Sequence, residues 1–130
     1  MADCRGSQGG INLPAVTKTL ESIKKITPQP LFAVMPGDLV GGASSYSSEK
    51  AQLQYFKNTI TKYYPMSFFY PGFGNHEATA GIKGEEAFQE VFPEIKGSFL
   101  EGYHNTVYYF DNSTTRFYML NSNHPGLFYI

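Results

Sequence analysis

Two short apolar runs, each followed by a proline–glycine pair, constrain the fold of this chain more than any other feature. The runs are residues 31–35 (LFAVM) and 66–70 (MSFFY). A short run without regular alternation of polar and apolar positions is typical of a strand that is buried on both faces. A helical segment precedes each run, and strand–helix–strand connections usually join parallel neighbours. The two runs therefore predict adjacent parallel strands in an α/β fold.

The helical segments are recognised by their hydrophobic periodicity. Residues 12–26 carry apolar side chains at steps of three and four, and Asn12 is the predicted N-cap. Residues 49–63 show the same spacing, with Ser48 as the predicted N-cap. A shorter helix is expected over residues 84–92.

The C-terminal third changes character and favours antiparallel strands. Residues 106–111 and 116–121 are aromatic-rich runs on either side of the polar stretch 112–115 (NSTT). This pattern predicts a β-hairpin with a four-residue turn. The fold class expected from the whole chain is therefore α/β, with parallel strand–helix units followed by a β-hairpin.

Composition excludes several classes of protein. A length of 130 residues suits one domain or a piece of one, and 42% hydrophobic with 16% charged residues does not suit a disordered chain. A net charge of −1 gives no footprint for nucleic acid. No apolar run reaches the ~18 residues of a membrane span, and the first residues do not form a signal peptide pattern, which leaves the compartment open. The single cysteine excludes an internal disulfide framework.

Three glycine-containing loops carry the candidate chemistry. They read Asp3-Cys4-Arg5-Gly6, Gly37-Asp38-Leu39-Val40 and Gly74-Asn75-His76-Glu77. The last two leave the carboxyl ends of the predicted parallel strands, where ligands bind in such sheets. Each motif alone is typical of a turn, and only the conjunction of the three indicates a site. Carboxylates, an amide oxygen and an imidazole form a donor set that suits manganese, iron or zinc.

These three motifs resemble the first three motifs of the calcineurin-like metallophosphoesterases, which read Asp-x-His, Gly-Asp-x-x and Gly-Asn-His-Asp/Glu. The spacing of 37 residues from Asp38 to Asn75 is normal for one β-α-β unit of that family. Residues 108–111 and 116–122 also resemble its later strand pair. The resemblance implies an incomplete α/β sandwich of the metallophosphoesterase type.

The resemblance also implies an activity and a site. The activity is metal-dependent hydrolysis of phosphoric esters, as a phosphatase or phosphodiesterase, with two metal ions (Mn, Fe or Zn). By position, Asp38 is expected to bridge the metals, while Asp3 binds the first and Asn75 the second. His76 matches the residue that contacts the phosphate and protonates the leaving group. In such sites two metal ions hold the attacking and leaving oxygens and lower the pKa of a shared water.

Arg5 departs from the family pattern, because the first motif normally has histidine at this position. A guanidinium has no lone pair for a metal, so Arg5 is expected to hold a phosphate oxygen or to pair with Asp3. We favour a variant site over an inactive one. Cys4 is expected to be a small buried residue, and Glu77 to orient its loop rather than to bind metal.

The family pattern further implies a buried strand before the first motif and later histidine ligands. Only two residues precede Asp3, and the later motifs are not found in this sequence. Residues 1–130 are therefore expected to form a partial domain that is inactive alone and self-associates through exposed strand edges, above all at residues 31–35. The alternatives are an inactive phosphate- or protein-binding fragment of the same fold and a structural fragment without a function of its own.

Two other histidines are candidate substitute ligands. His124 follows the second hairpin strand and is expected on the same rim as Asp38 and Asn75, either near the site or as an exposed loop residue. His104 precedes the first hairpin strand, at the opposite end, and is expected to be structural.

Overall fold

The computed structural model describes residues 1–125 and has an α/β architecture with one parallel and one antiparallel sheet. The elements are β1 (Arg5–Gln8), α1 (Leu13–Ile23), β2 (Ala33–Met35), α2 (Tyr46–Ile60), β3 (Phe69–Pro71), α3 (Ile82–Val91), β4 (Ser98–Phe99), β5 (Tyr108–Asn112) and β6 (Thr115–Met119). Short 3₁₀ helices cover Met66–Phe68 and Glu77–Ala80. None of the helices in the described residues combines the length and apolar character needed to span a bilayer.

The predicted parallel strand pair is confirmed, although both strands are shorter than expected. β2 and β3 run parallel with Val34 opposite Tyr70. The first part of the run 66–70 forms a 3₁₀ turn because the Phe68 N–H bonds back to the carbonyl of Pro65. Burial on both faces is wrong for most of β2, since only Met35 is fully buried. A sheet of three-residue strands is too narrow to bury them completely.

The N-terminal segment lies along the outer edge of β2. The terminal amine of Met1 donates to the Val34 carbonyl at 3.1 Å, and the Cys4 N–H donates to the Asp38 carbonyl at 2.8 Å. The Cys4 carbonyl in turn accepts from the Asn12 N–H at 2.7 Å. The expectation of an unpaired edge at this strand is therefore wrong where residues 1–4 cover it.

The helices follow the predicted order with shifted boundaries: α1 and α2 end three residues earlier than predicted, and α3 begins two residues earlier. Asn12 caps α1 as predicted and accepts from the Ala15 N–H at 3.3 Å. α2 begins earlier than predicted, because Ser45 rather than Ser48 is its N-cap. The earlier start brings Tyr46 into the first turn, where its hydroxyl bonds to a glutamate of α3. The use of Ser45 as the N-cap thus coincides with a tertiary contact between α2 and α3.

The predicted hairpin is present, with a tighter turn. Asn112 pairs with Thr115, so the turn has two residues rather than four. Ser113 in the turn has a φ of 55°, as two-residue hairpin turns require. An ion pair between Arg116 Nε and Asp111 Oδ1, at 2.7 Å, joins the two strands. β4 adds a third, antiparallel strand to this sheet.

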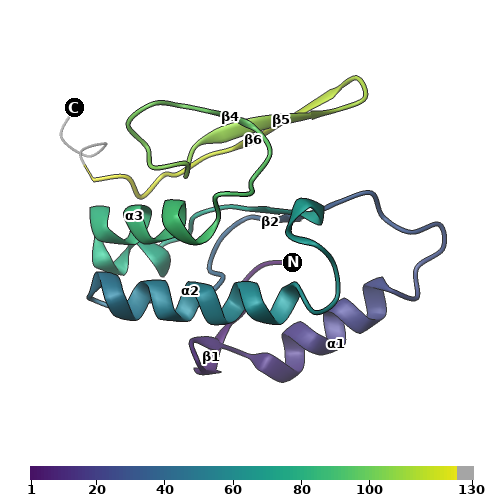
Figure 1. The fold of residues 1–130 in the computed structure, drawn as a ribbon, viewed down its shortest axis with the longest axis horizontal. Helices are drawn as coiled ribbons and strands as arrows, with labels where there is room; N and C mark the ends of the chain where they lie inside the picture. Colours follow the sequence, from purple (N-terminus) through teal and green to yellow (C-terminus); the bar gives the residue numbers. More distant parts are fainter. Residues whose placement is uncertain (126–130) are drawn as a thin grey trace.

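Figure 1 shows the parallel pair between α2 on one side and the β4–β6 sheet on the other. Aromatic rings join the two sheets: Tyr70 stacks on Phe110 with 3.5 Å between ring centroids, and Phe32 meets Phe110 edge-on. The Tyr108 hydroxyl donates to the Pro71 carbonyl at 2.8 Å. These contacts hold the hairpin sheet over the end of β3. The largest fully buried apolar side chains are Phe56, Phe69, Phe88, Phe92, Ile11, Leu20, Met35, Leu39, Leu53 and Ile60.

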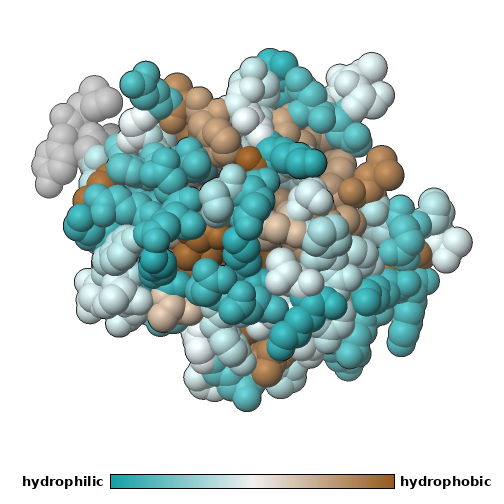
Figure 2. Space-filling view, viewed as in Figure 1, coloured by the Kyte–Doolittle hydropathy of each residue, from teal (hydrophilic) through white to brown (hydrophobic). Residues whose placement is uncertain are grey.

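Some large apolar side chains stay on the surface, among them several on or beside the antiparallel sheet. Leu120, Tyr118 and Leu100 are 72%, 63% and 54% exposed. They line a hollow of about 230 Å³ together with other residues of β4–β6. Figure 2 shows hydrophobic patches among hydrophilic side chains on the face in view. The sheet surface therefore offers apolar area to other molecules.

Candidate metal and phosphate site

The loops that follow β2 and β3 touch each other at the carboxyl edge of the parallel sheet. A Cβ atom added to Gly37 would lie 2.7 Å from the Gly74 nitrogen, and one added to Gly74 would lie 2.3 Å from Asp38 Oδ1. Gly37 also has a φ of 125°, a conformation that other residues rarely adopt. Glycine at both positions thus brings Asp38 next to the Gly74-Asn75 backbone.

The three predicted metal ligands line one hollow. Asp3, Asp38 and Asn75 surround a cavity of about 270 Å³, whose rim is completed by Ser122 and Asn123. Both aspartates have left-handed backbones, with φ of 52° at Asp3 and 51° at Asp38. Such conformations cost free energy outside glycine and cluster at functional sites. The structure therefore brings the first three motifs together, as the sequence predicts.

Glu77 joins the two loops through its carboxylate. Its side chain is fully buried, and Oε2 accepts from the N–H groups of Asp38 (3.0 Å) and Gly74 (2.8 Å). Oε1 accepts from the Val40 N–H at 3.0 Å. Burial raises the pKa of Glu77, an effect that these N–H donors oppose. Glu77 thus orients the loops and does not face the cavity, in agreement with its predicted role.

His76 is held between the second loop and Arg5. Its Nδ1 lies 2.8 Å from the Gly41 carbonyl oxygen, which can only accept, so Nδ1 carries the proton. Nε2 then accepts from Arg5 Nη1, which it contacts directly. The backbone N–H of His76 donates to Asp38 Oδ1 at 3.2 Å. The imidazole therefore has a defined tautomer, with Nε2 toward Arg5.

Arg5 belongs to the first motif and also contacts the third. Its Nε is 3.5 Å from Asp3 Oδ1, and its side chain is 48% exposed. The structure thus has the Arg5–Asp3 pair that the sequence offered as one alternative, and it adds the contact with His76, which sequence reasoning missed. An exposed guanidinium keeps donors available for an anion from solvent.

Cys4 is a buried residue next to this site rather than part of it. Its side chain is 4% exposed, and burial raises the pKa of the thiol to about 11. The thiol therefore stays protonated near neutral pH and is a poor nucleophile or ligand. This agrees with the expectation of a small buried side chain.

None of the three histidines lines the cavity, and neither does Arg5. His124 follows the rim residues Ser122 and Asn123, but its Nδ1 bonds to the buried Glu85 carboxylate at 2.8 Å instead. His104 lies at the surface with its Nδ1 3.3 Å from a glutamine side chain. The residues that sequence reasoning missed are Ser122 and Asn123, whose position after a strand end was the available signal.

The donor set suits a cation held by oxygen atoms. Across residues 1–125, no group of three or more His, Cys, Asp or Glu side chains is gathered as a metal cluster would require. The cavity instead offers two carboxylates and an amide oxygen from Asp3, Asp38 and Asn75. Such hard ligands fit manganese or magnesium better than a soft metal. The residues thus fit a hard cation, with fewer protein ligands than a closed site has.

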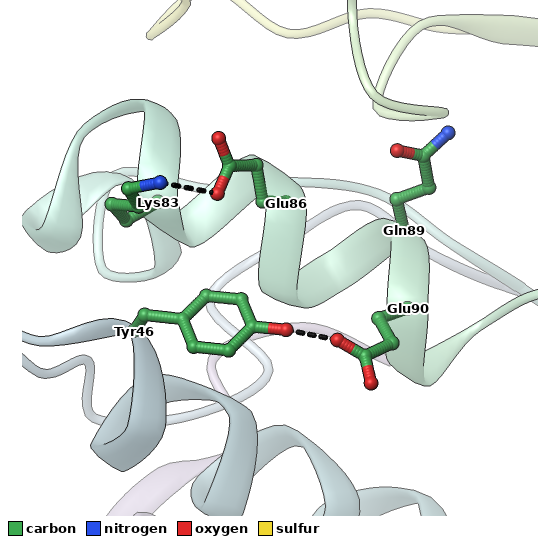
Figure 3. Close-up of a pocket in the computed structure, with 5 residues that line it drawn as sticks. All are labelled: Tyr46, Lys83, Glu86, Gln89 and Glu90. Carbon is green, nitrogen blue, oxygen red and sulfur yellow. Dashed lines mark hydrogen bonds and ion pairs between the residues drawn. The ribbon is translucent and has the colours of Figure 1, made fainter.

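A second hollow lies between the start of α2 and α3. Figure 3 shows the five residues that line its volume of about 460 Å³: Tyr46, Lys83, Glu86, Gln89 and Glu90. Lys83 Nζ lies 2.7 Å from Glu86, and the Tyr46 hydroxyl points at Glu90. Each carboxylate here already has a donor, so this hollow is less suited to a metal than the one at the strand ends.

Comparison with models of protein families, with curated proteins and with solved structures gave no match. The chemistry of the site is therefore argued from its residues and their geometry.

Proposed function

We propose that residues 1–130 belong to a metallophosphoesterase-type α/β domain and that the protein hydrolyses phosphoric esters, as a phosphomonoesterase or phosphodiesterase, with two metal ions (Mn, Fe or Zn). The observation that carries this proposal is the cavity shared by Asp3, Asp38 and Asn75 at the carboxyl ends of parallel strands. Three motifs that are far apart in the sequence meet where ligands bind in such sheets.

Each residue has a role that its surroundings support. A bound metal would polarise a phosphoryl oxygen and lower the pKa of a bound water. Asp3 and Asp38 would supply negative charge to the metal ion, and Asn75 would supply an amide oxygen. The Arg5 guanidinium does not line the cavity but pairs with the cavity residue Asp3, and from this position it would donate to a phosphate oxygen.

His76 would exchange a proton with the leaving group through Nε2. Its Nδ1 proton is engaged by the Gly41 carbonyl, which leaves Nε2 as the reactive nitrogen. Without substrate, Nε2 accepts from Arg5. A phosphate ester that takes over the Arg5 donors would free Nε2 to take up a proton from water, and the resulting imidazolium would then give this proton to the leaving group.

Manganese binding is the first test, because it does not depend on the substrate. Asp38→Asn is expected to lower bound Mn²⁺ by at least one equivalent in a titration followed by calorimetry or electron paramagnetic resonance. Asp111→Asn is the matched control, since Asp111 is exposed and pairs only with Arg116 on the hairpin. Equal Mn²⁺ binding by the two variants would contradict the proposal.

Hydrolysis of an aryl phosphomonoester and a bis-aryl phosphodiester tests the activity itself, in the protein that contains this chain. We expect Mn²⁺-stimulated turnover that Asp38→Asn abolishes. Full activity in the presence of a chelator would exclude the metal-dependent mechanism.

One observation favours a second candidate, a catalytically inactive domain that binds phosphate or a phosphorylated protein. The Arg5 guanidinium is exposed and carries several N–H donors, which need no metal to attract an anion. This alternative predicts that inorganic phosphate binds in the presence of EDTA, that Arg5→Ala weakens this binding, and that no ester is hydrolysed with Mn²⁺.

A further inference from the structure

Two side chains of α2 hold the loop segment 41–43 from one side. Glu49 is fully buried, and its Oε2 accepts from the Ala43 N–H at 2.7 Å. One turn later, Gln52 Nε2 donates to the Gly42 carbonyl at 3.1 Å. Both residues lie outside the three cavity motifs, and sequence reasoning assigned them no role in the site.

The opposite side of the same segment carries His76. The Gly41 carbonyl oxygen accepts from His76 Nδ1 at 2.8 Å. A Cβ atom added to Gly42, which has a φ of 82°, would lie 2.3 Å from the His76 carbonyl oxygen. The segment is thus packed between α2 and His76, and a shift of Ala43 or Gly42 moves the acceptor that sets the imidazole tautomer.

We propose that Glu49 and Gln52 are positioning residues for His76. They fix segment 41–43, and its Gly41 carbonyl, together with the Arg5 donor at Nε2, keeps the proton of the imidazole on Nδ1, so that Nε2 stays the accepting nitrogen. The functional meaning of this arrangement rests on the proposed hydrolysis, whereas the tautomer is a property of the folded chain and can be measured without metal or substrate.

The unused oxygens of these side chains support a role beyond packing. In the described part of the chain, Glu49 Oε1 and Gln52 Oε1 are buried without a hydrogen-bond partner. An unpaired buried acceptor is costly and is retained where something else requires the residue. Burial raises the pKa of Glu49 to about 7, with the Glu77 charge adding to this rise.

The test is the ratio of the two neutral tautomers of His76, read from the imidazole ¹⁵N shifts at about pH 9, well above the ordinary pKa of histidine. The wild-type chain is expected to have mainly the Nδ1–H form. Glu49→Ala and Gln52→Ala are expected to lower the ratio of Nδ1–H to Nε2–H by up to about fivefold, the effect of losing the Gly41–His76 hydrogen bond at ordinary net strength. The Arg5 donor at Nε2 is unchanged in both variants and continues to favour the Nδ1–H form.

Two further variants separate positioning from stability. Glu49→Gln retains an acceptor for Ala43 and should keep the tautomer ratio within about twofold, the resolution expected for a retained hydrogen bond. Gln54→Ala is the control on α2, because this exposed side chain donates to Asn58 at 2.9 Å and should leave the ratio unchanged.

Two outcomes would overturn the proposal. One is a wild-type chain with mainly the Nε2–H form. The other is a folded Glu49→Ala chain, or a folded Gln52→Leu chain if Glu49→Ala does not fold, with the wild-type ratio. Failure of ester hydrolysis would leave the tautomer result intact, so the two proposals fail separately.

Discussion

Glu77→Gln is the sharpest test of how the site is held together. The Glu77 carboxylate accepts from three backbone N–H groups, two at Oε2 and one at Oε1. An amide of the same shape keeps one acceptor oxygen and replaces the other with a donor. If the amide oxygen serves Asp38 and Gly74, the new NH₂ group faces the Val40 N–H, so at least one buried donor loses its acceptor.

The magnitude follows from these contacts. One buried unsatisfied N–H costs about 1–3 kcal/mol, and the two remaining bonds weaken because the acceptor is no longer charged. Removal of a buried charge offsets part of this loss. We therefore expect Glu77→Gln to lower the free energy of unfolding by about 2–3 kcal/mol.

Urea unfolding measures this change as a shift of the midpoint at constant slope. Glu86→Gln is the matched control: Glu86 lies at the surface and pairs with Lys83, and its replacement should change stability by less than about 0.5 kcal/mol. Glu77 also sets the distance between the loops of Asp38 and Asn75. Mn²⁺ affinity should therefore fall in Glu77→Gln and stay unchanged in Glu86→Gln. Identical midpoints for the two variants would refute the assignment of Glu77 as the link between the loops.

Four other predictions follow from single contacts. His76→Asn should retain bound Mn²⁺ but slow ester hydrolysis roughly 10²- to 10⁴-fold, as expected for loss of a general acid; loss of the metal instead would make His76 a ligand. Gly74→Ala should destabilise the fold by about 1–3 kcal/mol and weaken Mn²⁺ binding because of the overlap with Asp38, whereas Gly41→Ala, with no atom closer than 3.6 Å, should be near neutral. Folding raises the pKa of Glu49 from 4.5 to about 7. The contribution of Glu49 to the free energy of unfolding is therefore fully present below pH 4.5 and is lost as the pH increases to about 7, by up to roughly 3 kcal/mol. The free energy of unfolding of Glu49→Gln, measured at pH 5 and 7.5, should lack this part of the pH dependence. The chain should self-associate through the β4–β6 surface, and sedimentation velocity should show less association for Leu120→Lys, whose side chain is 72% exposed in the wild type; a monomer at all concentrations would contradict this.

Local patterns predicted the elements whose causes are local. The periodicity of residues 12–26 and the cap at Asn12 depend on neighbours within one helical turn, so α1 begins where predicted. The two apolar runs between turn residues likewise predicted β2 and β3 and their parallel pairing. The position of Asp38 and Asn75 after these strands then placed both at one edge of the sheet.

Contacts between distant segments decided the remainder. The start of α2 at Tyr46 accompanies a partner on α3, and the cover of the β2 edge by residues 1–4 depends on hydrogen bonds to Val34 and Asp38. No periodicity encodes the burial of Glu77 beneath two loops or of Glu49 behind segment 41–43. A buried carboxylate is stable only where the folded backbone supplies donors, and those donors come together only when the tertiary structure has formed.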